Sequence, residues 1–113
     1  MKIKVGDIVL GSEIKLADTT LSRMIGLMFK KQMNGFDGLL IKPCNSIHTF
    51  FCRYNLDILF LDKDMKIVKI IRNLKPWRMT WIYFKSCQVL ELNGGTLSNK
   101  VKEGDTLEVI CIN

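Results

Sequence analysis

The chain has 113 residues, of which 48% are hydrophobic and 25% charged, so it is long enough for one domain and too apolar for a disordered tail. Its 17 Lys and Arg residues outnumber its 11 Asp and Glu residues, which gives a net charge of +6. The excess falls in residues 63–85, which hold seven basic residues and one acid. A polyanion partner is therefore one hypothesis to test, beginning with this segment.

The sequence lacks the signals of membrane insertion and export. No apolar run approaches the roughly 18 residues that a spanning helix needs, and Gly6 and Asp7 interrupt the N-terminus before a signal peptide can form. We therefore predict a cytoplasmic protein with no membrane partner and with reduced cysteines, which show no CxxC spacing. Cys44, His48 and Cys52 resemble half of a zinc site, but no second ligand pair follows, so we predict no metal.

Short apolar runs separated by turn residues predict a mainly β chain. In chain order, strands are expected over residues 3–5, 8–10, 13–17, 39–41, 47–54, 57–62, 66–72, 88–92 and 106–112. An apolar repeat with helical spacing predicts one short helix near residues 20–29. The strands on either side of Lys63-Asp64 are expected to form a hairpin. The sum is a single β-rich α+β domain over residues 1–113, a compact antiparallel β-sandwich or barrel.

Three polar residues are candidates for a site. His48 is the only histidine, and in the predicted strand 47–54 it shares a face with Cys52. Asp57 begins an apolar strand and Glu91 lies between two leucines, where an unpaired buried carboxylate would be costly. Converging side chains would suit metal, sugar or acid–base chemistry. The alternative is a hydrogen-bonded histidine at the edge of the core and a Glu91 side chain that faces solvent.

A second candidate site lies where basic and aromatic residues are interleaved within residues 63–85. Its predicted binding patch consists of Trp77, Arg78, Trp81 and Tyr83. Such a mixture suits stacking on bases or sugars while cations hold phosphates. The basic residues recur every three positions, however, whereas side chains on one face of a strand recur every two, so a single binding stripe is not implied. Solvated charges around a hairpin and its loop are the alternative.

Several stretches of the sequence match the motifs of a known family. They are Gly26-Leu27-Met28, Ser46-Ile47-His48-Thr49-Phe50-Phe51, Leu56-Asp57-Ile58-Leu59-Phe60-Leu61-Asp62 and Val89-Leu90-Glu91-Leu92. On these residues the chain resembles the bacterial and archaeal domain-of-unknown-function 192 family. The resemblance implies a compact β-sandwich or barrel with a short helix, and no established activity. Cys52 and Cys87 stand where members usually carry Met and Ala, which implies that an apolar group, not a thiol, is needed there.

We therefore predict a small monomeric binding or accessory module without a cofactor, whose partner is a carbohydrate, a small molecule or a protein. The sequence contains no GxSxG, HExxH, P-loop or GxGxxG motif, so an enzyme is the less favoured interpretation. The first alternative is an enzyme or metal-dependent site built on His48, Asp57 and Glu91. The second is a nucleic-acid or polyanion binder that uses residues 63–85.

Overall fold

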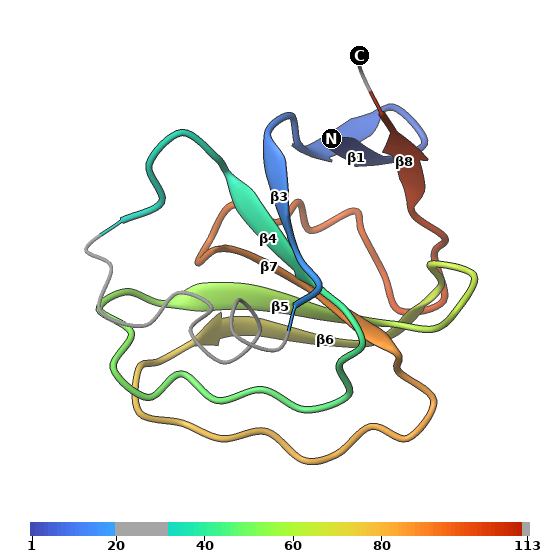
Figure 1. Ribbon diagram of the computed structural model, residues 1–113. Helices are drawn as coiled ribbons and strands as arrows, with labels where there is room; N and C mark the ends of the chain where they lie inside the picture. The colour runs from blue at the N-terminus through green and yellow to red at the C-terminus, as the bar shows by residue number, and fades with distance from the viewer. Residues whose placement is uncertain (20–31, 112–113) are drawn as a thin grey trace.

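The computed structural model describes residues 1–19 and 32–111, and in these residues eight strands form two sheets (Figure 1). A mainly β fold is confirmed. The described strands stay in two separate sheets and do not close into a barrel. The helix predicted near residues 20–29 lies outside the described residues. Within the described ranges, no helix has the length and hydropathy needed to span a bilayer.

The smaller sheet has the order β2-β1-β8, and all of its pairs are antiparallel. Its strands are β1 (Lys2–Val5), β2 (Ile8–Gly11) and β8 (Glu108–Ile110). The turn between β1 and β2 places Gly6 at a φ of 55°, a left-handed conformation that glycine adopts without a steric cost. The sheet therefore joins the two ends of the described chain, as Figure 1 shows.

The larger sheet has the order β3-β4-β7-β5-β6. Its strands are β3 (Ile14–Ala17), β4 (Gly38–Ile41), β5 (Leu56–Leu61), β6 (Ile67–Leu74) and β7 (Gln88–Asn93). The hairpin predicted around Lys63-Asp64 is confirmed as β5-β6. The pairing is mostly antiparallel, as expected, and the exception among the described strands is the parallel pair β3 and β4. Residues 18–37 separate these two strands, and parallel neighbours need a crossover of such length.

Both faces of the larger sheet are covered, which is why its central strands β5 and β7 are buried at nearly every position. The first core lies between the two sheets and includes Ile3, Leu40, Leu59, Leu61, Leu90, Leu92, Leu97 and Leu107. The second core lies on the opposite face and includes Leu39, Ile41, Ile47, Cys52, Leu56, Ile58, Phe60 and Val89. Alternate residues of one strand thus serve two different cores.

Two segments without regular strands cover the second core. These segments, residues 42–55 and 75–87, are called here the loop layer, and they form the lower margin of the molecule in Figure 1. They run side by side in opposite directions. The Thr49 amide donates to the Arg78 carbonyl at 2.8 Å, and the Trp77 amide donates to the Thr49 carbonyl at 3.0 Å. A bridge between His48 and Met79 continues this pairing.

The strand predicted over residues 47–54 is wrong. Only His48 takes part in a bridge, and the chain then turns at Phe50 and Phe51. The φ of Phe51 is 65°, and the Cys52 amide donates back to the Thr49 carbonyl at 3.1 Å. Aromatic and β-branched residues are favoured on any half-buried surface, so their presence does not distinguish this turn from a hydrogen-bonded strand. The other predicted strands are confirmed within two residues at each end.

The outer edge of β6 is covered by the segment that follows β7. The Ile67 amide donates to the Asp105 carbonyl at 2.8 Å, and the Ile67 carbonyl accepts from the Gly104 amide at 2.8 Å. Farther along the strand, the Glu103 carboxylate accepts a hydrogen bond from the Ile70 amide at 3.0 Å. The backbone groups at these positions are therefore paired although β6 lies at the edge of its sheet.

Candidate functional site

The three predicted polar residues do not meet in one site. Asp57 pairs with Leu92 across β5 and β7, and Glu91 pairs with Ile58. Because side chains alternate between the two faces of a strand, Asp57 faces the first core and Glu91 the second. His48 lies on the exposed outer side of the loop layer. The alternative in which Glu91 faces solvent is also wrong, because Glu91 is buried.

The buried carboxylate of Asp57 is held by hydrogen bonds from the backbone. Its carboxylate accepts backbone hydrogen bonds from Asn73 at 2.9 Å, from Gly95 at 3.0 Å and from Leu97 at 2.9 Å. Three amide donors stabilise a buried carboxylate, and such charge-assisted bonds are about twice as strong as neutral ones. Asp57 thereby ties β5 to the end of β6 and to the turn that follows β7.

Glu91 is buried without such donors. Its side chain is 4% exposed, and no described residue forms a hydrogen bond with its carboxyl group. Burial raises the pKa of Glu91 from 4.5 to about 8, because an ionised carboxylate is poorly solvated there. The group is therefore predominantly protonated at neutral pH and is a hydrogen-bond donor rather than a charge.

Two further titratable groups are close enough to Glu91 to be affected by it. Burial first, and the Glu91 carboxylate second, raise the pKa of the Cys52 thiol to about 11. Burial, Cys52 and Glu91 raise the pKa of Tyr54 to about 12, and among the described residues its buried hydroxyl has no hydrogen-bond partner. A thiol with a raised pKa is a poor nucleophile. The cluster is thus a set of neutral polar groups without an activated nucleophile.

His48 is hydrogen-bonded within the loop layer. Its ring stacks on Phe50 with centroids 5.0 Å apart, and its Nδ1 accepts from the Phe50 amide at 3.2 Å. The predicted shared face with Cys52 is wrong, because Cys52 points into the second core while His48 is exposed. Over residues 1–19 and 32–111, no three His, Cys, Asp or Glu side chains are grouped closely enough to hold a metal ion.

Six large apolar side chains of the loop layer are exposed, and this set is called here the aromatic surface. They are Phe51, Trp77, Met79, Trp81, Ile82 and Phe84. Trp81 is 83% and Phe84 87% exposed, which is exceptional for side chains of this size. Trp77, Arg78 and Trp81, which were predicted as part of a binding patch, are all exposed. Tyr83 instead faces inward and packs on Phe60, with ring centroids 4.5 Å apart.

A buried threonine fixes the backbone beneath the aromatic surface. Thr49 is fully buried, and its hydroxyl donates to the Lys75 carbonyl at 2.6 Å and accepts from the Arg78 amide at 2.9 Å. With its two backbone bonds to residues 77 and 78, this residue holds one segment of the loop layer against the other. The loop that presents the tryptophans is therefore constrained at its base.

Two aromatic residues of this surface have unusual backbone conformations. Phe51 has a φ of 65° and Trp77 a φ of 63°, both in the left-handed region. A bulky residue pays about 1–2 kcal/mol to be there, and such conformations concentrate at binding and active sites. The two rings pack edge to face with centroids 4.6 Å apart. The centroids of the Trp77 and Phe50 rings are 5.9 Å apart. Two of the four non-glycine residues with a positive φ in the described chain thus belong to the aromatic surface.

The two segments that carry the aromatic surface also carry exposed positive charge. Arg53, Lys75, Arg78 and Lys85 are exposed, and neither residues 38–56 nor residues 65–90 contain an acid. None of these four cations forms an ion pair with an acid of the described chain. The remaining charge of residues 63–85 is directed elsewhere. The Arg72 guanidinium, for example, donates to the carbonyls of Leu97, Ser98 and Val101 at 2.9 to 3.2 Å.

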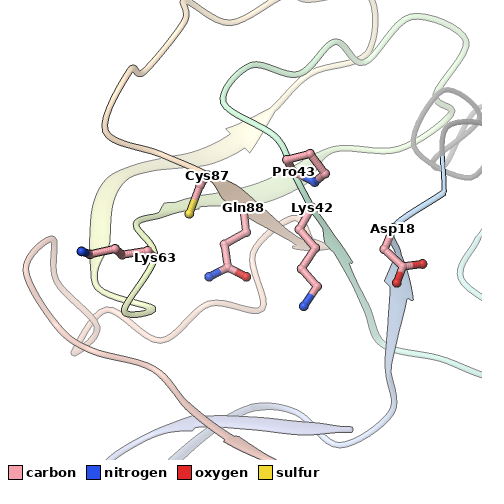
Figure 2. A pocket seen from close by; sticks show the side chains of 6 residues that line it. All are labelled: Asp18, Lys42, Pro43, Lys63, Cys87 and Gln88. Atoms are coloured by element: carbon pink, nitrogen blue, oxygen red, sulfur yellow. The ribbon is translucent and has the colours of Figure 1, made fainter.

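A separate pocket of about 440 Å³ opens beside the ends of β4 and β7 (Figure 2). It is lined by Asp18, Lys42, Pro43, Lys63, Cys87 and Gln88. Figure 2 shows Lys42 and Gln88 side by side, whereas Lys63 and Asp18 lie at opposite margins. The Gln88 side-chain amide donates to the Asp62 carbonyl at 3.0 Å. Dispersed groups of both charges do not define the chemistry of one ligand.

Part of the aromatic surface was missed from the sequence. Trp77, Met79 and Trp81 recur at every second position, and this spacing indicates one face of an extended segment. The same spacing would include Tyr83, which packs on Phe60, and would leave out Ile82 and Phe84, which are exposed. Phe51 had no such signal, because its exposure results from the turn at its own backbone.

These features define a small two-sheet β domain with a constrained, exposed aromatic and cationic surface. The sequence profile of the DUF192 family, described as an uncharacterized ACR, matches residues 1–109, and the chain belongs to this family. An uncharacterised UPF0127 protein of Pyrococcus horikoshii is 38% identical over 72 residues, covering 59% of this chain and 60% of that protein. One of Thermococcus kodakarensis is 31% identical over 101 residues, covering 84% and 63%. The chain thus spans less than two thirds of either relative.

Solved structures share the fold. A protein of unknown function from Novosphingobium aromaticivorans superposes with a TM-score of 0.80 at 23% identity, covering 96% of this chain and 82% of that one. A "putative transcription regulator" from Sinorhizobium meliloti superposes with a TM-score of 0.74 at 28% identity, covering 95% and 89%. The family is uncharacterised, so neither comparison establishes an activity.

Proposed function

We propose that the protein is a non-catalytic binding module and that the aromatic surface is where its partner binds. The observation that carries this proposal is the grouping of six large apolar side chains on one constrained loop layer, with Trp81 and Phe84 more than four-fifths exposed. Exposed apolar patches with a polar rim mark interaction sites. Trp, Phe, Met and Arg are the residues enriched at such sites.

The polar groups support binding rather than catalysis. His48, Asp57 and Glu91 lie in three different environments, and the Cys52 thiol beside Glu91 has a raised pKa of about 11.

We also propose a reducing compartment such as the cytoplasm. None of the four cysteines of the chain forms a disulfide bond, and cysteines that stay as thiols are typical of proteins kept in reducing conditions.

A photo-crosslinking experiment tests this function in the organism that makes the protein. A photoreactive phenylalanine replaces Trp81 in the aromatic surface, or Lys100 on the side of the first core as the matched control. We expect a discrete crosslinked partner from position 81 and none from position 100. The recovered partner is then titrated against the wild type, with tryptophan emission as the signal. Equal crosslinking from both positions, or an affinity unchanged by Trp81→Ala, would contradict the proposal.

A nucleic-acid partner is a second candidate, because basic residues and exposed aromatic rings together suit single-stranded binding. The description of the Sinorhizobium relative as a transcription regulator adds weight to it. A labelled single-stranded oligonucleotide distinguishes the two. Binding that weakens with salt and disappears in Trp81→Ala would favour nucleic acid, and its absence at low salt would exclude it.

A further inference from the structure

We propose that the aromatic surface docks on the surface of an anionic lipid bilayer. This inference rests on the proposed function and names the class of its partner. The protein would lie on the membrane without crossing it, so no spanning segment is required. The sequence-based expectation of no membrane partner considered only spanning and export signals, and it did not address a peripheral contact.

The composition of the surface favours a lipid interface over other partners. Trp is typical of the membrane–water boundary, where its ring lies at the level of the headgroups, and Phe accompanies Trp on the apolar face of interfacial segments. Met79 and Ile82 are exposed beside them, 68% and 53% respectively. Aliphatic side chains cannot stack on bases or sugars, but they gain free energy when they enter hydrocarbon. Their presence therefore favours a bilayer over a nucleic acid or a carbohydrate.

The charge of the surface specifies the kind of lipid. Arg53, Lys75, Arg78 and Lys85 are exposed in the same two segments as the apolar side chains, and the two stretches of chain that supply them contain no acid. Each Lys or Arg near an anionic leaflet strengthens binding about fivefold. A second copy of the chain is a poor occupant, because facing copies would bring two sets of unpaired cations together.

The shape of the loop layer fits this orientation. Its two segments form one margin of the molecule, away from the smaller sheet (Figure 1). Thr49 and the paired backbone hold the segments to each other, so little conformational freedom is lost on docking. Tyr83 anchors the same loop to the second core through Phe60. A preorganised loop can therefore carry exposed aromatic rings into an interface.

Vesicles of stated composition test the proposal directly. Both tryptophans of the chain, Trp77 and Trp81, belong to the aromatic surface, so intrinsic emission reports contact without a label. The full chain is mixed with vesicles of equal parts phosphatidylglycerol and phosphatidylcholine, or of phosphatidylcholine alone. We expect co-sedimentation and a blue shift of emission with the anionic vesicles, with binding that falls as salt increases.

Two sets of variants separate the apolar and charged contributions. Phe84→Ala should weaken vesicle binding about tenfold while leaving both fluorophores in place. The double variant Arg78→Gln with Lys85→Gln should weaken it about thirtyfold. The matched control removes two exposed cations near the first core, Lys100→Gln with Lys102→Gln, and should bind as the wild type does. Circular dichroism checks that every variant is folded.

Each outcome decides the inference. Wild-type binding to anionic vesicles that is reduced by both sets of variants and not by the control supports it. No binding at low salt, equal binding to neutral vesicles, or equal losses in the control overturns it. If vesicles fail while position 81 still crosslinks to a protein, the membrane inference is wrong and the binding module stands. If position 81 also yields no partner, both are wrong.

Discussion

Trp77 packs edge to face against Phe51, and both residues hold left-handed backbone conformations, with φ values of 63° and 65°. A contact between two residues that each carry a conformational cost shows that the surrounding pairing determines their backbone, because neither residue prefers it. The hydrogen-bonded backbone of the loop layer thus imposes the left-handed conformation on the two aromatic residues.

Substitutions at Trp77 should reveal this strain. Glycine normally destabilises a protein more than alanine, but at a positive φ glycine avoids the steric cost that alanine keeps. Both variants lose the ring contacts with Phe50 and Phe51. We therefore expect Trp77→Gly to be more stable than Trp77→Ala by about 1 kcal/mol. Urea unfolding followed by far-ultraviolet circular dichroism measures the difference, and the reverse order would show that the site is unstrained.

Glu91 should make the stability of the protein depend on pH. Its pKa is raised from 4.5 to about 8 in the folded state, so the folded protein favours the protonated form. The stabilising contribution of that form is complete below pH 4.5. It is lost as the pH rises to about 8, by up to about 1.4 kcal/mol per pH unit.

The variant Glu91→Gln tests this assignment, because it keeps the shape of a neutral carboxyl group and cannot ionise. We expect wild type and variant to have similar stability near pH 4 and the variant to be several kcal/mol more stable at pH 8. Denaturant unfolding across this range gives both curves. Parallel curves for the two proteins would show that Glu91 is already ionised in the fold.

Loss of the charge at Asp57 should destabilise the protein, whereas loss of the charge at Glu91 should stabilise it at pH 8. Asp57→Asn replaces an acceptor of three backbone amides with a group that presents two donors of its own. We expect a loss of about 2–4 kcal/mol in the free energy of unfolding. The exposed Asp7 provides the control, since Asp7→Asn should change stability by less than about 0.5 kcal/mol. Equal effects at the two positions would contradict the structural role of Asp57.

The four thiols should react at different rates. Cys87 and Cys111 are exposed, whereas Cys52 is buried and its pKa is raised to about 11. We expect the double variant Cys87→Ser with Cys111→Ser to lose the fast phase of reaction with a disulfide reagent at pH 8. The slow thiol of Cys52 should react fully only after unfolding. A fast phase that survives the double variant would place Cys52 or Cys44 at the surface.

Apolar periodicity predicted the sheets well and the candidate site poorly, for different physical reasons. The β5-β6 hairpin follows from local alternation and a turn, which the sequence states directly. The separation of Asp57 from Glu91 depends on register between strands 30 residues apart, which local patterns do not contain. The exposure of Phe51 depends on a turn beside Thr49, which is hydrogen-bonded to Arg78 of the other segment. Long-range contacts of this kind determined where the polar and aromatic residues lie.

The covered edge of β6 determines how the larger sheet behaves at high concentration. An open strand edge recruits further strands, and sheets that grow in this way form aggregates. Here the Ile67 and Ile70 amides are taken by Asp105 and Glu103, so a neighbouring molecule finds no free donor at either position. The segment after β7 thus blocks the addition of further strands to β6, and its detachment would expose this edge.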